Sequence, residues 1–508
     1  MLTVSPRNGV VALALIFCLI VAFQFPSFND TRWNELRDHA SAMIGRPPAP
    51  ADEGLSLPSD YLWKSDDQEQ CEQFYGLSYI RNIAQNQHSY CQDGSPSTMQ
   101  CFLGNRLQGP WDTDPLCLAR GALVSRGKPT SLHCQLRNFT MESEHSPEAA
   151  VKNTGVHGID DMGSYFFDTG AGEEFRTWTF GEGSGDGGAA CSAQASTNNG
   201  QWILLAKREG NVNLWHKLME IWQAIISIEA LRLARNPATG QPYLTAAELA
   251  GIRVVLEDDR AEPLDDWWTM VAGKAPVRKA DLPDGCYANV IIPLAGSSSP
   301  FWTFLLERRE HEVCRTPALI DAFVRRILSH LGLIPRAETA VRADPVVTII
   351  DRKQTRKFRD LDVLAARLRE RHPRARFHVV DLAALSLREQ VALVQDSDVL
   401  VGHHGAGMTH VLFLPAEAAA VEIFPPVFPS LGFRHVARMR GVTHFVGHCM
   451  WHEEWDWVVN GVALPEGWTP PANEAGWQEA EWTYMAEDEF VGLVDAAVRS
   501  QLNRRPVH

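Results

Sequence analysis

The stretch from Val346 to Phe424 constrains the fold of this chain more than any other feature. Apolar segments that fit strands alternate there with amphipathic segments that fit helices. The expected strands are 346–350, 377–380, 399–401 and 420–424, and the expected helices are 360–371, 386–395 and 408–414. Strands and helices that alternate at this spacing form a parallel sheet covered by helices. We therefore predict an α/β domain.

The chain before this stretch shows weaker signals of the same kind. Segments 201–206 and 254–256 fit strands, and 213–234 fits a long helix whose apolar residues face a core. A last amphipathic helix is expected over 483–502, after a Trp-rich segment. These patterns predict two lobes followed by a tail.

Length and charge narrow the classes of function. The chain has 508 residues and a formal net charge of −15, so it is long enough for about three domains of ordinary size. An acidic chain is a poor partner for nucleic acid, because phosphate binding needs a cationic field. We therefore expect no nucleic-acid partner, although a local basic pocket is compatible with the average.

The start of the chain carries an apolar run. Residues 9–25 hold no charge and follow Arg7, and seventeen residues is about the minimum for a membrane span. We favour a signal anchor with a cytosolic tail over 1–8 and a Pro-rich stalk over 26–65; a cleaved signal peptide is the alternative. Either reading places the rest of the chain in the lumen of the secretory pathway, in the endoplasmic reticulum or Golgi. The anchor reading makes this a single-pass type II membrane protein.

Cysteine usage fits that compartment. The chain has ten cysteines, of which one lies in the apolar run and five lie close together: Cys71, Cys91, Cys101, Cys117 and Cys134. In an oxidising compartment such clustering predicts disulfides across a loop-rich segment. Nine lumenal cysteines leave at least one free thiol, and the pairing stays open. Asn138 begins a glycosylation sequon and is the preferred acceptor over Asn29.

A Gly-rich segment follows the expected strand 399–401. Gly405 and Gly407, with Ala406 between them, let backbone amides approach an anion at the start of a helix. His404 can donate to a phosphate oxygen, and Thr409 falls in the first turn. Glu422, at the end of the next strand, is placed to accept from a ribose hydroxyl. The alternative is a tight turn whose glycines serve packing.

A basic segment follows the expected strand 346–350. Arg352 and Arg356 carry forked donors that suit a diphosphate. Lys353 and Lys357 fit a solvated loop better. On the expected helix 213–234, His216 and Glu220 are four residues apart and share one face, so they could form a catalytic base dyad or orient an acceptor hydroxyl. The alternative is a structural pair, and the spacing lacks the second histidine of a zinc-protease helix.

Together these residues resemble glycosyltransferase family 61. The run DVLVGHHGAGMTHVLFLPAEAAAVEI, residues 398–423, is similar to the H-G-A-G-[LM]-T-[HN]-x-x-F-x-P signature of that family. The run NLWHKLME, residues 213–220, resembles its N-x-x-H-x-x-x-[DE] motif. The family usually has Ser before the arginine at 352, where this chain has Asp351. The segment from Cys71 to Cys91 resembles the EGF-domain-specific O-linked N-acetylglucosamine transferases of the family.

The resemblance implies a GT-B fold, in which two Rossmann-like lobes face a cleft. The implied amino-terminal, acceptor-side lobe is 66–335, the nucleotide-sugar-binding lobe is 336–450, and the Trp-rich tail with its helix is 451–508. It also implies inverting transfer of a sugar from a UDP donor to a hydroxyl of a protein or glycan. The implied donor site comprises Arg352, Arg356, His404, Gly405, Ala406, Gly407, Thr409 and Glu422, with His216 and Glu220 as the catalytic pair.

Several alternatives stay open. The donor sugar is N-acetylglucosamine, xylose or arabinose by this resemblance. No cofactor and no metal ligand is expected, although the acidic pairs Asp258-Asp259 and Asp265-Asp266 keep a divalent ion as an alternative. A catalytically inactive lumenal binding protein would share the fold. A nicotinamide-dependent oxidoreductase is the more distant alternative, because G-x-G-x-x-G does not follow the first strand of the α/β domain.

Overall fold

The computed structural model describes residues 61, 69–105, 113–139, 156–165, 167–181, 191–192, 201–210, 213–303, 314, 317–336, 342–425, 430–449 and 474–504. All of them fall within one compact unit, Ser56–His508. No helix in these ranges is both long and apolar enough to cross a membrane. The predicted anchor, most of the predicted stalk and most of the Trp-rich segment lie outside the described residues.

The predicted α/β domain is confirmed by a five-stranded sheet in which every strand is parallel to its neighbours. Its strands are β12 (Val346–Ile350), β14 (Arg376–Val380), β15 (Val399–His403), β16 (Ala419–Phe424) and β17 (Thr443–His448). Their order across the sheet is β14-β12-β15-β16-β17. In chain order this is 2-1-3-4-5, the flavodoxin-like arrangement of a doubly wound fold.

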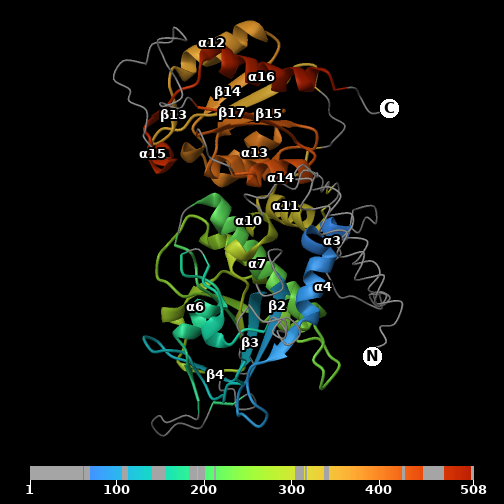
Figure 1. Ribbon diagram of the computed structural model, residues 1–508, viewed down its shortest axis with the longest axis vertical. Helices are drawn as coiled ribbons and strands as arrows, with labels where there is room; N and C mark the ends of the chain where they lie inside the picture. The colour runs from blue at the N-terminus through green and yellow to red at the C-terminus, as the bar shows by residue number, and fades with distance from the viewer. Residues whose placement is uncertain are drawn as a thin grey trace, which may run out of the picture. The chain divides into compact units, whose positions relative to one another are not determined.

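Helices cover both faces of this sheet (Figure 1). One face packs against α12 (Leu361–Arg371) and α16 (Glu487–Leu502), and the other packs against α13 (Leu387–Gln395), the 3₁₀ helix η6 (Ala406–Phe413) and α14 (Gly432–Met439). The strand residues are apolar on both faces because both are buried. The capping box predicted at Ser386 and Glu389 is present at the start of α13.

Two helices of this domain begin at other residues than predicted. The last helix begins at Glu487 rather than at 483, because Trp482 and Thr483 form β18 (Trp482–Thr483), which pairs with β13 (Lys357–Phe358). The helix expected over 408–414 is η6, a 3₁₀ helix that already begins at Ala406. We call residues 342–504 the C-lobe and residues 69–336 the N-lobe.

The N-lobe is built on a mixed sheet of seven strands in the order β1-β2-β3-β11-β7-β8-β9. The strands are β1 (Gln87–Ser89), β2 (Thr98–Asn105), β3 (Thr113–Arg120), β7 (Trp202–Ala206), β8 (Arg253–Leu256), β9 (Val277–Arg278) and β11 (Asn289–Ile292). Strands β11, β7, β8 and β9 are parallel, and β1 to β3 are antiparallel. The predicted strands 201–206 and 254–256 are confirmed as β7 and β8.

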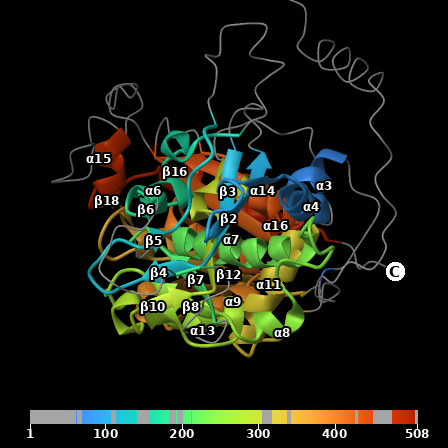
Figure 2. The same cartoon turned by 90° about the horizontal axis from the view of Figure 1, so that it is seen from below.

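The long helix predicted over 213–234 is confirmed as α7 (Leu214–Leu233). Nearly all of its residues are buried, including polar ones, as is typical of a helix that runs through a core. Figure 2 shows α7 lying lengthwise against the sheet that contains β2 and β7. Because α7 is packed into the core, the residues of its first turn are held in fixed positions near the carboxyl end of β7.

Smaller elements complete the N-lobe. Its other helices are α3 (Glu69–Tyr75), α4 (Leu77–Gln85), α6 (Ala171–Arg176), α8 (Ala246–Leu249), α9 (Thr269–Ala272), α10 (Pro300–Thr303) and α11 (Ala318–His330). A second sheet joins β10 (Gly285–Tyr287), β4 (Ala122–Val124), β5 (Ser131–Leu132) and β6 (Thr179–Phe180). Short 3₁₀ turns are η1 (Ile159–Asp161), η2 (Asp265–Trp268), η3 (Lys279–Asp281), η4 (Gly296–Ser298) and, in the C-lobe, η5 (Leu382–Ala384). The helix α15 (Glu474–Glu479) precedes β18.

Four disulfides join cysteines of the N-lobe. Two lie inside the predicted Cys-rich cluster, Cys91–Cys134 and Cys101–Cys117. The others reach across the sequence, Cys71–Cys314 and Cys191–Cys286. Among the described cysteines Cys449 is free, and it is buried. The prediction of disulfides with an unpaired thiol is confirmed. One cysteine of the cluster, Cys71, pairs with a cysteine outside it.

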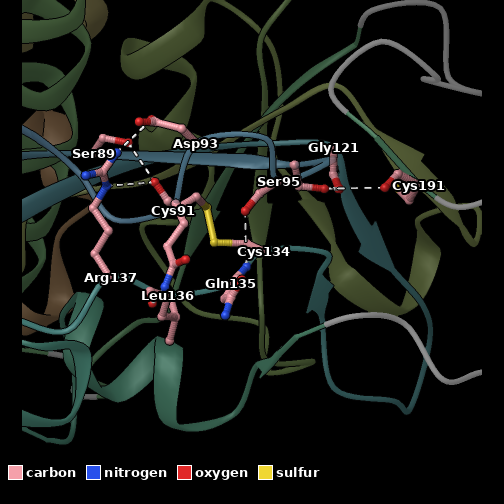
Figure 3. Close-up of a disulfide and its surroundings, with 12 residues drawn as sticks. Ser89, Cys91, Asp93, Ser95, Gly121, Cys134, Gln135, Leu136, Arg137 and Cys191 are labelled. Atoms are coloured by element: carbon pink, nitrogen blue, oxygen red, sulfur yellow. Dashed lines mark hydrogen bonds and ion pairs between the residues drawn. A yellow bond between two sulfur atoms is a disulfide. The ribbon is translucent and has the colours of Figure 1, made fainter.

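The surroundings of Cys91–Cys134 include Arg137, the residue just before the predicted glycosylation sequon (Figure 3). Arg137 donates to the carbonyl of Cys91 over 3.0 Å and to Asp93 over 2.7 Å, so the chain just before the sequon is held to the bridge. Asn138 is exposed and lines an open groove with Gln92 and Phe139. Modification of Asn138 stays a prediction, since Thr140 lies outside the described residues.

Candidate active site

The order of the C-lobe strands marks one edge of the sheet as a binding edge. In an open parallel sheet, ligands bind where the strand order reverses, beyond the carboxyl ends of the two strands at that point. Here the reversal lies between β12 and β15. The basic segment that begins at Asp351 follows β12, and the Gly-rich loop that begins at His404 follows β15. The fold therefore brings the two predicted donor-binding segments to the same place.

Arg356 joins these segments directly. Its Nη1 donates to the backbone oxygen of His404 over 2.8 Å and to Oε1 of Gln478 over 2.6 Å. Arg352 is held by its own loop, where Nε donates to the backbone oxygen of Thr355 over 2.8 Å and Nη2 donates to the Thr355 hydroxyl over 3.1 Å. Both guanidinium groups are thus preorganised by neutral oxygens.

Neither arginine forms an ion pair with a carboxylate of the described residues. Burial, together with the nearby positive charge of Arg352, lowers the pKa of Arg356 to about 10, and burial also lowers the pKa of Arg352. The Nε of Arg356 is buried without a partner in this part of the chain. Two close cations without a counter-charge destabilise the protein, and an anionic ligand would relieve that repulsion.

The Gly-rich loop is shaped to approach Arg356. Gly405 has φ +133°, which L side chains rarely adopt, and a Cβ there would lie 3.2 Å from the guanidinium of Arg356. Residues 404–407 are partly exposed, whereas Thr409 is fully buried with no hydrogen-bond partner for its hydroxyl among the described residues. The helix begins three residues before Thr409, so this residue lies beyond its first turn and is buried, and its part in donor binding stays a prediction.

His404 rests on a buried carboxylate. Its Nδ1 bonds to Oε1 of Glu422 over 2.6 Å, and Nε2 of His444 bonds to Oε2 of the same carboxylate over 2.8 Å. Glu422 is 1% exposed, and although burial opposes ionisation, the two histidines lower its pKa. The sequence predicted that Glu422 accepts a hydrogen bond from a ribose hydroxyl. In the structure both of its oxygens are instead bonded to histidines. It supports His404 from below.

The lysines of the basic segment lie apart from this pair of arginines. Lys353 is exposed and bonds to Asp351. Lys357 bonds to Glu481 over 2.5 Å and lies 3.9 Å above the ring of Trp482. The solvated loop expected for Lys353 agrees with its exposure, but Lys357 is a packed residue because β13 pairs with β18.

The predicted pair on α7 is arranged differently from the expectation. Asn213 caps the helix by accepting from the amide of Trp215 over 2.9 Å. The Nδ1 of His216 bonds to Oε2 of Glu209, a residue of the loop between β7 and α7. The direct His216–Glu220 dyad is therefore wrong. A residue seven positions earlier supplies the carboxylate because the loop folds back over the first turn of α7.

Glu220 is enclosed beneath that loop. Its Oε1 accepts from the backbone amide of Glu209 over 2.5 Å, and its Oε2 accepts from Nζ of Lys217 over 3.0 Å. Burial raises the pKa of Glu220 to about 7 against the opposing charge of Lys217. With both oxygens engaged inside the fold, Glu220 holds the loop in place, and a catalytic role for it stays a prediction.

The acidic segments near Asp258 and Asp265 are neutralised by arginine. Arg208 is fully buried and bonds to both Asp258 and Asp265, and it lies 3.2 Å from Glu262. Arg278 also bonds to Asp265, over 2.5 Å. No group of three or more His, Cys, Asp or Glu residues suited to a metal ion lies within the described ranges.

An aromatic contact connects the predicted donor and base residues. The ring of Phe433 in α14 lies 5.3 Å from the ring of Trp215, the residue before His216, and 5.7 Å from the ring of His404. Arg440, just after α14, bonds to Asp321 in α11. The first turn of α7 and the Gly-rich loop are therefore neighbours on either side of one side chain.

Comparison with known proteins identifies this region. Residues 214–421 match the family described as Glycosyltransferase 61. This part of the chain belongs to glycosyltransferase family 61. The matched residues run from the first turn of α7 to β16, so they include both segments that Phe433 connects.

Three relatives show the extent of the similarity. The EGF domain-specific O-linked N-acetylglucosamine transferase of Drosophila melanogaster is 29% identical over 228 residues, which are 43% of this chain and 39% of that protein. The corresponding enzyme of Xenopus laevis is 34% identical over 26% of this chain and 25% of its own length. Beta-1,2-xylosyltransferase XAX1 of Oryza sativa subsp. japonica is 43% identical over 29% of this chain and 27% of its own length. The chain thus spans about two fifths or less of these relatives.

A D-isomer specific 2-hydroxyacid dehydrogenase from Xanthobacter autotrophicus Py2 is 11% identical, with a TM-score of 0.15 over 59% of this chain and 96% of that one.

The sequence did not single out several residues of the family 61 region and its surroundings. Glu209 precedes the family motif, and no local pattern marks it as the partner of His216. Phe433 and Trp302 lie far away in sequence, and Trp302 packs its ring 4.3 Å from the ring of His216. The one available signal was position, because Glu209 follows a parallel strand at its carboxyl end, where functional groups gather.

A buried pair of carboxyl groups nearby predicts how stability depends on pH. Glu174 shares a hydrogen bond with Glu257 and accepts from Nε1 of Trp178 over 2.7 Å. Burial, then the charge of Glu257, raises the pKa of Glu174 to about 8. The folded protein therefore keeps a proton that the unfolded chain releases near pH 4.5, and this contribution to stability falls as pH rises from about 4.5 to 8.

Glu174→Gln should flatten that dependence. The free energy of unfolding in urea is measured near pH 5.5 and near pH 8. The loss between these two pH values should be roughly 1–3 kcal/mol smaller in the variant than in the wild type. Glu229→Gln, another buried glutamate of the N-lobe, should keep the wild-type dependence. Equal losses in Glu174→Gln and the wild type would show that Glu174 is ionised across this range.

Proposed function

We propose that this protein is an inverting glycosyltransferase that moves a sugar from a UDP donor to a hydroxyl of a protein or glycan. The observation that carries the proposal is the pair Arg352 and Arg356 at the strand-order reversal of a family 61 region. Their forked donors, preorganised beside a Gly-rich loop and without carboxylate partners among the described residues, suit a diphosphate.

In this proposal Arg352, Arg356 and the amides of residues 405–407 hold the diphosphate. The first amides of a helix lack intrahelical partners and favour an anion. His404 is held by the Glu422 carboxylate through Nδ1 and contributes a second donor at Nε2 when both ring nitrogens carry a proton. These groups stabilise the charge that develops on the leaving diphosphate.

His216 acts as the base in the same proposal. The acceptor hydroxyl gives its proton to His216 as its oxygen bonds to the anomeric carbon from the face opposite the diphosphate. The bond between that carbon and the diphosphate oxygen breaks, UDP leaves with the electron pair, and the anomeric configuration inverts. The contacts of Phe433 with Trp215 and His404 support a site shared by the two lobes, as the GT-B arrangement requires.

The setting of the reaction is part of the proposal. Four disulfides support an oxidising compartment, and we place the catalytic part in the lumen of the secretory pathway behind an N-terminal anchor. Transfer should need no divalent ion, because protein cations face the diphosphate and the acidic residues Asp258 and Asp265 are held by Arg208. Activity lost to a chelator and restored by manganese would contradict this part.

The donor sugar is the open choice, and one screen tests it together with the function. The names of relatives include N-acetylglucosamine, xylose and arabinose transferases. The lumenal part of the chain, expressed without residues 1–30, is incubated with each UDP-sugar and a mixture of glycans and EGF-like domains, and UDP release is measured. We expect release with one of these three sugars and stabilisation against heat by UDP. Stabilisation by NAD but not by UDP would favour an oxidoreductase, and binding of UDP without turnover would favour an inactive relative.

A further inference from the structure

The loop between β7 and α7 contains a buried carboxylate that the family motif does not include. Glu209 follows β7 at its carboxyl end and is 4% exposed. Its Oε2 bonds to Nδ1 of His216. A carboxylate can only accept, so Nδ1 carries the proton of the neutral ring and Nε2 keeps the basic lone pair.

The ring of His216 is fixed by more than this bond. Trp302 packs against it edge-on at 4.3 Å, and Phe167 lies 5.8 Å away on a turn where Phe167 and Asp168 both have positive φ. Two successive L residues in the left-handed region store strain, which folds retain mainly near functional sites. The carboxylate sets the tautomer and the aromatic residues set the orientation of the ring.

The backbone of Glu209 is in turn held by the motif residue Glu220. The amide of Glu209 donates to Oε1 of Glu220 over 2.5 Å, and Lys217 bridges Glu220 and Glu262 at 3.0 and 2.9 Å. A side chain at Gly296 would place its Cβ 2.9 Å from the amide of Glu220, so the glycine permits this close packing. Through this hydrogen bond the motif residue Glu220 holds the loop that carries Glu209.

One oxygen of Glu209 has no donor. Its Oε1 is buried and without a hydrogen-bond partner in the part of the chain that the structure describes. A buried carboxylate oxygen left unpaired costs free energy, so its presence in the fold needs an explanation. The geometry points to that explanation in His216, which is the neighbour that gains from a fixed negative charge.

We propose that Glu209 is the positioning residue for the base His216, an inference that rests on the proposed transferase function. Glu209 holds the proton on Nδ1, so that Nε2 receives the proton of the acceptor hydroxyl, and its negative charge stabilises the imidazolium that forms. The proton leaves Nε2 to solvent after the glycosylated product departs.

The isosteric variant Glu209→Gln tests this role. We expect kcat to fall about 100-fold or more while the KM for the UDP-sugar changes less than threefold, because the donor groups lie in the C-lobe. The other charged groups around this site, Lys217, Glu220 and Glu262, stay in place. Glu209→Asp, which keeps the charge, should recover part of the loss.

Two measurements separate this role from a structural one and from failure of the proposed function. Glu229→Gln replaces a buried, ion-paired glutamate on the same helix, far along from His216, and should leave kcat and the His216 tautomer unchanged. Long-range ¹H–¹⁵N NMR of the histidine rings, assigned with His216→Gln, should show the Nδ1–H tautomer in the wild type and an increased Nε2–H fraction in Glu209→Gln.

The outcomes are distinct. A wild-type protein that neither binds UDP nor transfers sugar contradicts the proposed function, while the NMR tautomer still reports on Glu209. Wild-type turnover in Glu209→Gln overturns the positioning role. So does an Nε2–H ring in the wild-type protein.

Discussion

Arg356→Ala is expected to bind UDP about 10- to 100-fold more weakly than the wild type, which is the loss expected for one charge-assisted contact to a phosphate. The guanidinium is fixed at 2.8 Å from the His404 carbonyl and 2.6 Å from Gln478, so it meets the ligand without further ordering. Arg352→Ala should act in the same direction. Isothermal titration with UDP measures both.

Surface charge alone does not account for this expected loss. Arg374 is an exposed arginine of the same lobe that pairs with Asp344, and Arg374→Ala should keep the wild-type affinity. Gly405→Ala should weaken UDP binding as well, because L residues rarely adopt its φ of +133° and a Cβ only 3.2 Å from the Arg356 guanidinium would displace that group. Wild-type affinity in Arg356→Ala, with a folded protein shown by its thermal midpoint, would remove the diphosphate site from this edge.

His216→Gln is expected to reduce kcat by roughly 10²- to 10⁴-fold, the range for removal of a general base. The donor groups lie on the C-lobe, so the Kd for UDP should stay within about twofold of the wild type. Rapid-quench measurement of a single turnover would show whether the loss falls on the chemical step. The amide of Gln can still bond to Glu209, which limits the structural effect of the change.

The matched control is His330→Gln, since His330 is an exposed histidine at the end of α11 in the same lobe. This variant should transfer sugar at the wild-type rate. If His216→Gln transferred sugar as fast as His330→Gln, the base would have to be sought elsewhere, and the contact with Glu209 would be structural.

The C-lobe was predictable because its determinants are local. Apolar strands such as 346–350 and the capping box at Ser386 and Glu389 read directly from short windows. The carboxyl ends of parallel strands lie at one edge of their sheet. The sequence therefore predicts that Arg352 and His404, which both follow such strands, lie at the same edge. The long helix α7 was also legible, since its apolar residues recur through twenty positions.

Residues that act through contacts distant in sequence were not predictable. Cys71 pairs with Cys314 across 243 residues, and no spacing rule connects them. Thr409 points inward because η6 is wound as a 3₁₀ helix, a difference of a fraction of a turn that sequence patterns do not resolve. Glu422 had the right residue type for a ribose, but its two histidine partners come from separate strands and loops.

The sequence by itself therefore determined an α/β fold, the family 61 resemblance and the residue types of the candidate donor site, because periodicity and short motifs are encoded in neighbouring positions. Only the tertiary structure decided which carboxylate serves His216, since backbone folding after β7 brings Glu209 over the first turn of α7. It also showed that Arg352 and Arg356 share one site without a carboxylate partner among the described residues. Burial and charge pairing depend on the whole fold, and the chemistry of the site depends on both.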